Sequence, residues 1–280
     1  MRIIVCVKQV PDTSEVKIDP VTNNLVRAGV PSVINPSDRT AFETALRLRA
    51  AHGGTITVIS MGPPQAAEEL ERCLRWGADE AYLLCDRKLG GADTLATGYA
   101  LAALIGRIGF DLVLCGNEAI DGCTGQVGPG IGEQLGIPAF SYVSEIFREG
   151  ETTWSVVRAS GDTRDTYHTR LPALACMLRQ EKQSLPEREN VPEVRLVDAS
   201  QLDETRIGSQ GSPTRVVRIT VKQREYHYLH VDCHWSLEKR MDHIFRGGLP
   251  EKETVLLRGT PEEQAARIMK MLDQKEVQAV

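Results

Sequence analysis

Short β-rich apolar runs alternate with helical patterns through the first half of the chain, and this alternation restricts the possible folds more than any other feature. The strand-like runs cover residues 3–7, 55–61, 80–85 and 111–115, and the helical patterns cover residues 36–51, 66–76, 92–108 and 126–135. Such alternation is typical of a mostly parallel sheet with helices on both faces. We therefore expect an α/β fold with a doubly wound, Rossmann-like sheet of the kind that binds adenine nucleotides.

The second half of the chain, after about residue 140, shows a different pattern. Residues 141–147 and 153–158 alternate in polarity as a hairpin does, and residues 171–177 form a further apolar strand. We expect these strands to be antiparallel additions at the sheet edge. Residues 179–214 are polar, contain prolines and lack periodicity, which indicates an extended arm without a core of its own. The expected division is a nucleotide-binding α/β domain over residues 1–185 and a C-terminal arm and extension over residues 186–280.

Composition narrows the function classes. The 280 residues are 41% hydrophobic and carry a net charge of −5 with scattered basic residues, so a large core is expected and nucleic-acid binding is not. No apolar run reaches the roughly 18 residues of a membrane span, and the N-terminal run is too short for a signal peptide, so we expect a cytoplasmic protein without membrane insertion. None of the seven cysteines forms a CxxC pair, which argues against zinc ribbons and dithiol redox motifs.

The glycine-rich stretch "AIDGCTGQVGPGIGEQLGIP", residues 119–138, follows a strand-like run and leads into a helical pattern. Free N–H groups and the positive dipole end at a helix start favour a phosphate, and glycines at 122 and 125 would leave room for it. Thr124 and Gln126 offer hydrogen bonds, while Asp121 is expected to cap the helix or to hold a ribose hydroxyl. The spacing is neither GxGxxG nor a Walker loop, so a tight turn with close helix packing is the alternative interpretation.

Helix-capping residues mark several other element boundaries. The candidates for N-caps are Asn35 or Ser37, Asp93 or Thr94, and Thr260, which stands in capping-box spacing with Glu263. Proline follows Thr260 at the first helical position, where its missing N–H is not needed. We therefore expect helices to begin near residues 36, 94 and 261.

Several motifs in order resemble the beta (small) subunit of electron transfer flavoproteins. They are "VCVKQVPD" at 5–12, "VKIDPVTNNLVRAGVPSVINPSD" at 16–38, "MGPPQAAEEL" at 61–70, "GADEAYLLCDR" at 77–87, "GADTLATGYAL" at 91–101, "LCGNEAIDGCTGQVGP" at 114–129, "LPAL" at 171–174 and "GSPTRVVR" at 211–218. The resemblance is dense over residues 1–180 and patchy beyond them.

The resemblance implies a subunit that pairs with a larger, FAD-carrying alpha subunit and holds AMP or a second FAD in its own crevice. By position, the implied nucleotide contacts are Cys6, Asn35, Met61 and the loop 121–130, which contains Asp121, Gly122, Cys123, Thr124, Gly125, Gln126 and Val127. Residues 86–97 look like the flavin-bifurcating branch, which would place Asp93, Thr94 and Thr97 near the isoalloxazine of a beta-subunit FAD. This favours FAD over AMP. The flavin would supply the redox chemistry, so no catalytic acid, base or nucleophile is expected.

Departures from the family pattern concern charge and partner recognition. Asn117-Glu118 replaces the usual Lys-Gln pair, which removes a positive charge near the nucleotide loop, and Cys123 replaces a residue that is commonly aspartate. The usual recognition segment "NEPRYPSL" is replaced here by "RQEKQSLP", residues 179–186. We therefore expect a redox partner other than a standard acyl-CoA dehydrogenase.

The segment "YHYLHVDCHWSLEKRMDH", residues 226–243, groups four histidines and a cysteine. The spacing matches no standard structural zinc site, and the alternation also fits an ordinary strand. Its aromatic residues and arginine favour a docking surface for a dedicated partner.

Two other classes of nucleotide-binding protein compete with this interpretation. The first is a stand-alone adenine-nucleotide module similar to universal stress proteins, against which the long arm argues. The second is an adenylating enzyme, which would need an SGGxDS-type loop after the first strand, where residues 8–12 have "KQVPD".

Overall fold

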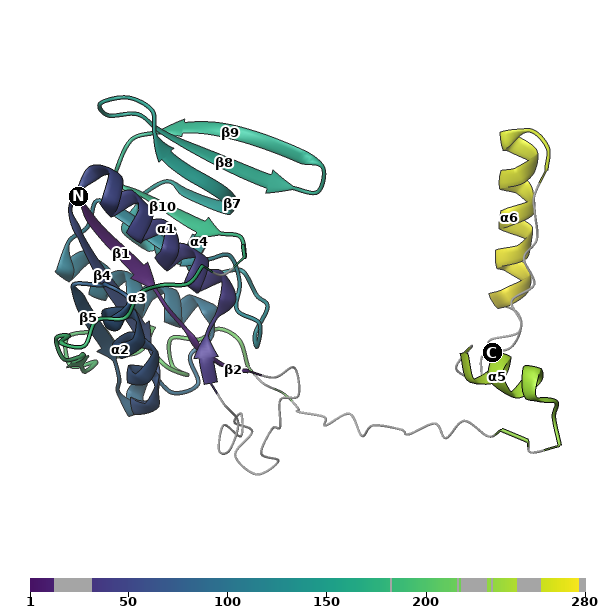
Figure 1. Ribbon diagram of the computed structural model, residues 1–280, viewed down its shortest axis with the longest axis horizontal. Helices are drawn as coiled ribbons and strands as arrows, with labels where there is room; N and C mark the ends of the chain where they lie inside the picture. The colour runs from purple at the N-terminus through teal and green to yellow at the C-terminus, as the bar shows by residue number, and fades with distance from the viewer. Residues whose placement is uncertain are drawn as a thin grey trace. The chain divides into compact units, whose positions relative to one another are not determined.

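The computed structural model describes residues 1–12, 32–181, 183–215, 217, 231–232, 234–245 and 258–276. The chain divides into two compact units, Met1–Val221 and Lys222–Val280. The first unit contains the sheet and helices α1–α4, and the second contains α5 (Leu237–Phe245) and α6 (Pro261–Glu276) (Figure 1).

A nine-stranded sheet forms the centre of the first unit, in the order β11-β5-β4-β1-β6-β10-β7-β8-β9. Its strands are β1 (Arg2–Cys6), β4 (Thr55–Met61), β5 (Glu80–Leu84), β6 (Leu112–Gly116), β7 (Ala139–Arg148), β8 (Trp154–Ser160), β9 (Thr163–Thr169), β10 (Ala173–Met177) and β11 (Arg195–Val197). The strands from β11 to β7 are parallel, whereas β8 and β9 pair antiparallel. The two short strands β2 (Gln9–Pro11) and β3 (Ser32–Ile34) pair separately. The predicted doubly wound α/β fold is confirmed.

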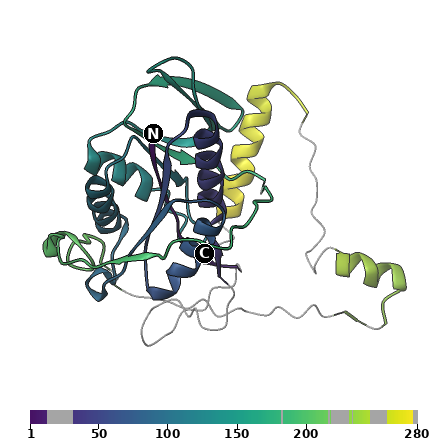
Figure 2. The same cartoon turned by 60° about the vertical axis from the view of Figure 1, so that its left-hand side comes forward.

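Helices cover both faces of the sheet, as Figures 1 and 2 show from two directions. The helices are α1 (Pro36–His52), α2 (Ala67–Arg75), α3 (Thr94–Ile108) and α4 (Val127–Leu135), with single 3₁₀ turns at Pro64–Ala66, Arg87–Leu89 and Glu204–Arg206. Alternate residues of a strand point to opposite faces, so Ile3 and Val5 of β1 join the core under α1 and α2, while Ile4 and Cys6 join the core under α3 and α4. Burial on both faces explains why the parallel strands are continuously apolar.

The strand over residues 171–177 is an interior parallel strand, so the prediction of an antiparallel edge strand there is wrong. β10 lies between β6 and β7 and runs parallel to both. All five of its residues are buried, which is the pattern of a central parallel strand. The predicted hairpin is confirmed as β7 and β8. The polar strand β9, which the sequence does not indicate, extends it (Figure 1).

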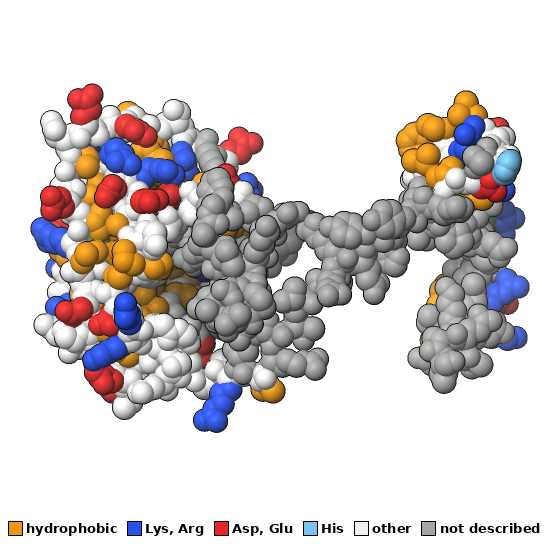
Figure 3. Space-filling model, turned by 90° about the horizontal axis from the view of Figure 1, so that it is seen from below, with side chains coloured by type: hydrophobic (Ala, Val, Ile, Leu, Met, Phe, Trp, Pro, Cys, Tyr) orange, Lys and Arg blue, Asp and Glu red, His pale blue; other side chains and the backbone are white. Residues whose placement is uncertain are grey.

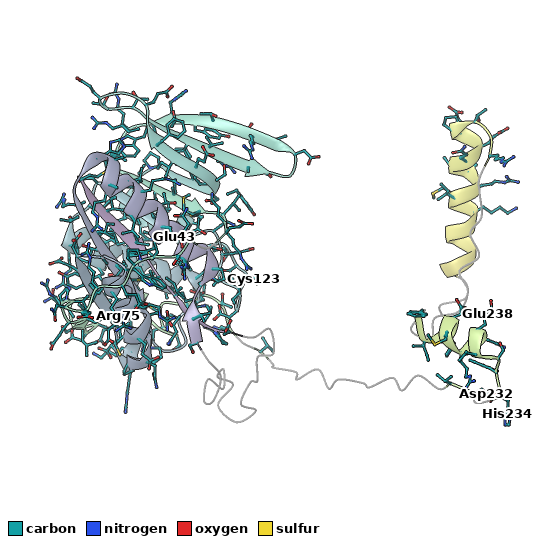
Figure 4. The ribbon with its side chains drawn as sticks, viewed as in Figure 1. Glu43, Arg75, Cys123, Asp232, His234 and Glu238 are labelled. Atoms are coloured by element: carbon teal, nitrogen blue, oxygen red, sulfur yellow. The ribbon has the colours of Figure 1, made fainter. Side chains whose placement is uncertain are left out.

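The arm folds onto the first unit, although its sequence gives little sign of structure. The N–H of Gln183 donates to Glu43 Oε1 of α1 at 3.3 Å, and the N–H of Arg188 donates to the carbonyl of Arg75 in α2 at 2.8 Å. Figure 4 labels Glu43 and Arg75, which mark this path across the two helices. Beyond it, β11 adds to the free edge of β5. Residues 186–215 thus lie within the first unit, and packing of the arm on a partner stays a prediction.

In the second unit, the predicted capping box at Thr260 is confirmed. The N–H of Thr260 donates to Glu263 Oε2 at 3.0 Å, and the N–H of Glu263 donates to Thr260 Oγ1 at 3.4 Å. These reciprocal bonds satisfy two N–H groups at the start of α6.

Close packing of α4 against the sheet depends on a missing side chain at Gly128. A Cβ there would stand 2.3 Å from Cys176 Sγ and 2.9 Å from Cys115 Sγ, whereas a Cβ at Gly130 would meet nothing within 4 Å. Gly128→Ala should therefore lower the free energy of unfolding by about 1–3 kcal/mol, because α4 must shift. Gly130→Ala should leave it unchanged or raise it by up to about 1 kcal/mol through helix propensity. Urea unfolding followed by circular dichroism tests this, and equal effects of the two substitutions would contradict it.

Candidate nucleotide-binding site

A cavity of about 390 Å³ opens where the strand order reverses, between β1 and β6. The carboxyl ends of β1, β4 and β6 and the first turns of α3 and α4 line it. In open α/β sheets this crevice is the usual place for a ligand. The geometry therefore favours a binding site at this point.

Ten of the thirteen predicted nucleotide contacts line this cavity. They are Cys6, Met61, Asp93, Thr94, Thr97, Gly122, Thr124, Gly125, Gln126 and Val127. Of the other three, Asp121 and Cys123 belong to the same loop, and Asn35 binds the backbone just before it. Nucleotide contact by any of the thirteen stays a prediction.

Asn35 fixes the backbone of the nucleotide loop instead of capping α1. It occupies the N-cap position, but its side chain makes no capping hydrogen bond there, so the expected capping is wrong. Its Nδ2 donates to the carbonyl of Glu118 at 2.9 Å, and its Oδ1 accepts the N–H of Ile120 at 3.2 Å. An amide side chain satisfies both a donor and an acceptor in this way. Asn35, just before α1, therefore fixes the backbone of residues 118–120 after β6.

The loop turns sharply before α4 begins. Cys123 has φ +49° with an exposed side chain, and Gly125 has φ +62°. The N–H of Cys123 donates to the carbonyl of Ala119 at 2.8 Å, which closes the first turn (Cys123 is labelled in Figure 4). A positive φ favours glycine, so Gly125 serves the turn whether or not a ligand is bound. The tight-turn interpretation is thus supported for this residue.

The start of α4 faces the cavity with its backbone. Val127 and Gly128 line the cavity and stand in the first turn, where N–H groups have no partner within the helix. Across the opening, Thr94 Oγ1 of α3 donates to Gln126 Oε1 at 2.8 Å. Together these groups form a cradle with the dipole of α4 directed at the cavity, which suits an anion.

Asp121 pairs with a lysine that the sequence analysis did not select. Its Oδ1 lies 2.6 Å from Lys8 Nζ, and Gln126 holds the N-cap position of α4, so the predicted capping by Asp121 is wrong. Lys8 stands two residues after the end of β1 and lines the cavity. The sequence signal for Lys8 was its position just beyond a predicted parallel strand, where ligand-binding residues commonly stand.

Asp38 is the second functional residue that the sequence analysis missed. Its side chain is buried and lines the cavity from the first turn of α1. Its Oδ2 accepts the N–H of Lys8 at 2.7 Å, and its Oδ1 accepts the N–H of Gly116 at 3.0 Å. Burial raises the pKa of this carboxyl to about 7, against the opposing effect of its hydrogen bonds. In the sequence, Asp38 looks like an ordinary acidic residue in the first turn of a helix, so nothing local marks it as part of the site.

Asp93 caps α3, as predicted, and also joins the cavity to the arm. Its Oδ1 accepts the N–H groups of Leu95 and Ala96 at 3.0 and 3.1 Å. Its own N–H donates to Ser212 Oγ at 2.8 Å, and its Oδ2 accepts the N–H of Thr214 at 3.3 Å. The carboxylate is therefore engaged with the protein itself at the cavity wall.

A second cavity of about 600 Å³ adjoins the first and shares Met61 and Ala92 with it. The turns after β4 and β5 and the loop before α3 line it: Gly62, Pro63, Pro64, Cys85, Asp86, Arg87, Leu89, Gly90 and Gly91. A ligand in the first cavity therefore has space beside it along the sheet edge.

Comparison with known proteins now gives the family. A family model described as the electron transfer flavoprotein domain matches residues 22–202. The electron transfer flavoprotein beta subunit of Thermoanaerobacterium thermosaccharolyticum is 45% identical over 234 residues, covering 80% of this chain and 90% of that protein. The chain belongs to the electron transfer flavoprotein beta-subunit family. Its function is electron transfer, and the alternative of a stand-alone nucleotide module is not favoured.

Two further relatives of this beta subunit carry other names. Protein FixA of Bradyrhizobium diazoefficiens is 43% identical over 236 residues, covering 78% of this chain and 82% of that protein. Subunit CarD of the caffeyl-CoA reductase–Etf complex of Acetobacterium woodii is 50% identical over 182 residues, covering 64% and 66%.

In the described part of the chain, no three His, Cys, Asp or Glu side chains are grouped to hold a metal ion, and no helix has the length and apolar character of a membrane span. Of the histidine-rich group, His227, His230 and Cys233 lie outside the described residues.

The raised pKa of Asp38 predicts a pH dependence of stability. Because the folded state keeps the proton up to about pH 7, this carboxyl contributes stability at low pH that is lost as the pH rises from about 4 to about 7. Asp38→Asn should flatten that fall, which is at most about 1.4 kcal/mol per pH unit. It should also cost about 1–3 kcal/mol, because an amide NH₂ then faces an N–H donor. Urea unfolding between pH 4 and 8 measures both effects. Asp165→Asn, at an exposed carboxyl group, is the control and should leave the pH dependence of the unfolding free energy unchanged. If the unfolding free energy of Asp38→Asn falls with pH as steeply as that of the wild type, the raised pKa of Asp38 is contradicted.

Proposed function

We propose that the cavity between β1 and β6 binds the adenine-nucleotide part of an FAD, with AMP as the alternative ligand. The observation that carries the proposal is the convergence of predicted contact residues from four separate segments on one cavity at the strand-order reversal. The backbone of Gly122–Val127 and the first turn of α4 would bind phosphate. Thr94 and Thr97 of α3 stand on the opposite side.

The choice of FAD over AMP rests on the neighbouring cavity. AMP would fill the first cavity alone, whereas a dinucleotide extends beyond it, and the shared lining at Met61 and Ala92 makes the second cavity the direction of extension. The backbone of the glycines at 62, 90 and 91 forms part of the wall of this second cavity. When bound, FAD supplies the capacity to accept and release electrons, and the chain binds it, orients it and limits its contact with water.

The proposed assembly is a heterodimer with an electron transfer flavoprotein alpha subunit. Beta subunits of this family pair with an alpha subunit, and one similar protein is named as part of a caffeyl-CoA reductase–Etf complex. The "GADTLAT" segment, residues 91–97, supports flavin-based bifurcation as the mode of electron transfer. In the same proposal, electrons pass between a dehydrogenase or NADH and an acceptor that is a different redox protein.

Flavin stoichiometry tests the ligand. The purified heterodimer should release about two FAD per pair on denaturation, measured by chromatography against protein concentration. A matched preparation of the alpha subunit alone shows how much of that flavin depends on the beta subunit. One FAD together with one AMP per pair would contradict the FAD assignment while leaving the nucleotide site intact. Absence of any second nucleotide would overturn the site.

The changed recognition segment supports a redox partner other than a standard acyl-CoA dehydrogenase. Its described residues, 179–181 and 183–186, run beside α1, where Arg39 Nη2 donates to the carbonyl of Gln183 at 2.6 Å and the N–H of Gln180 donates to Thr40 Oγ1 at 3.0 Å. Leu185 packs against the core of the first unit. These contacts fix the segment on its own subunit, and most of its described residues are exposed, so a docking partner would meet the changed side chains.

The segment 226–245 is the proposed docking surface in its place. Its helix α5 exposes Leu237, Met241 and Ile244, which repeat at helical spacing (apolar side chains at the right-hand end of Figure 3). The indole of Trp235 contacts the His243 ring edge-on with centroids 5.0 Å apart, and Lys239 Nζ lies 4.6 Å from the Trp235 ring centroid. Aromatic and basic anchors of this kind dominate many interfaces.

Deletion of residues 226–245 tests this surface. The shortened heterodimer should keep its flavin and lose at least tenfold in affinity for its redox partner, measured after pull-down from the native source and purification of that partner. Paired substitutions Leu237→Asp and Ile244→Asp should reproduce the loss, and Glu262→Gln on α6 should not. A folded, flavin-containing deletion variant that binds the partner equally well would show that the segment is not the docking site.

A further inference from the structure

We propose that Lys8 is the cation that binds the nucleotide phosphate in the cavity, and that Asp121 is the positioning residue that holds its ammonium beside the glycine loop. This inference rests on the proposed function and deepens it. It assigns the charge that recognises the 5′-phosphate of AMP or the corresponding phosphate of FAD.

The charged side chains around the cavity favour Lys8 as the group that meets the phosphate. Among the described residues that line it, Lys8 is the sole lysine or arginine, while Asp38, Asp93 and Glu118 carry carboxyl groups. The N–H groups of the loop carry only partial positive charge. Lys8 therefore supplies the one full positive charge among the described residues on this cavity wall.

The backbone of Lys8 is held on both sides. Its N–H donates to the buried Asp38 carboxylate at 2.7 Å, and its carbonyl accepts the N–H of Asn35 at 2.9 Å. The residue also follows β1, the central strand of the reversal. Only side-chain torsions can therefore move the ammonium, which reduces the entropy lost when it engages a ligand.

The ammonium is directed at the glycine loop. Lys8 Nζ lies 2.6 Å from Asp121 Oδ1 and 4.0 Å from the point where a Cβ on Gly122 would stand. Asp121 is only 11% exposed at its side chain, while Lys8 is 44% exposed, so the carboxylate is the more enclosed partner and the ammonium remains accessible. An ammonium has three donors, and the bond to Asp121 uses one of them. Within the described part of the chain no second hydrogen bond of this ammonium is formed, which leaves two donors for a phosphate oxygen.

Lysine suits this task better than a planar cation would. A compact point charge on a flexible stem contacts a terminal phosphate and a pyrophosphate equally well, without the fixed bidentate geometry of arginine. The site therefore recognises the phosphate that AMP and FAD share, and leaves discrimination between them to the second cavity.

Lys88 provides a matched control. It also follows a parallel strand, β5, and its Nζ lies 2.5 Å from Glu204 Oε1, but it lines neither cavity. Lys88→Met thus removes an ion pair of the same kind at the same sheet edge without touching the proposed phosphate site.

The test is calorimetric titration of the nucleotide-stripped heterodimer with AMP and with adenosine, which lacks the phosphate. Lys8→Met should weaken AMP binding by about tenfold to a hundredfold and change adenosine binding by less than about twofold, because only a charge-assisted phosphate contact is lost. Lys8→Arg, which keeps the charge but changes the geometry, should lose less AMP affinity than Lys8→Met, and Lys88→Met should match the wild type. Raising the salt concentration should weaken AMP binding in the wild type more than in Lys8→Met.

The outcomes separate this inference from the proposed function. Equal weakening of AMP and adenosine by Lys8→Met would show that the ion pair only holds the loop in shape, and unchanged binding of both would show that Lys8 has no role; either result overturns the inference. A wild-type heterodimer that binds neither AMP nor FAD in the beta subunit would overturn the proposed function itself.

Discussion

The buried carboxyl group of Asp38 joins the two strand ends beyond which the cavity opens. One oxygen accepts the N–H of Lys8, two residues after β1, and the other accepts the N–H of Gly116, the last residue of β6, so a single side chain from α1 links the two strand exits. The contact requires glycine at 116, because a Cβ there would stand 2.2 Å from the carboxylate oxygen. Burying this group is costly unless it is hydrogen-bonded, and here both oxygens have donors. The position of Lys8, and hence of its ammonium, follows from this contact.

The loop after β6 is positioned by side chains that are distant in sequence. Asn35 binds its backbone at two points and Lys8 binds Asp121 within it, from segments before α1 and after β1. Close packing of Gly128 against Cys115 and Cys176 then fixes the start of α4 relative to β6 and β10. The glycines of this stretch therefore have different roles. Gly125 permits a turn, Gly128 permits packing, and Gly122 leaves the loop open where the ammonium approaches.

The sequence predicts those parts of the fold in which local pattern and burial agree. The strands over residues 55–61 and 80–84 and the helices that follow them repeat a strong alternation, and the structure confirms them. β9 escapes prediction because its residues are mostly exposed and polar, and β11 because three residues carry no periodicity. The interior position of β10 depends on pairing with β6, some 60 residues away, which no local pattern specifies.

For the site, the same distinction applies to individual residues. The loop 122–127 is predictable because glycines and a helix start occur together in the sequence. The roles of Asp38 and Asp121 are not, because each depends on a partner at a separation of 30 to 113 residues. Asn35 and Asp121 show the resulting error: local sequence makes each a candidate cap for the nearest helix, whereas each side chain binds a distant segment. Local capping rules fail where a tertiary contact offers the side chain a better partner.

The arm is part of the scaffold of the cavity rather than an addition to it. Ser212 and Thr214 bind Asp93 on the cavity wall, the N–H of Ser209 donates to the carbonyl of Gly90 at 3.2 Å, and a Cβ on Gly208 would stand 2.0 Å from the carbonyl oxygen of Lys88. Ala199 and Ile207 are buried in the core under α3. A chain that ended at residue 185 would therefore expose apolar surface beside α3 and leave the loop 86–93, which borders both cavities, without these hydrogen bonds. Ser212 and Thr214, which bind Asp93, stand about ten residues before the second unit begins at Lys222. The end of the arm is therefore fastened to the cavity wall just before the chain enters that unit.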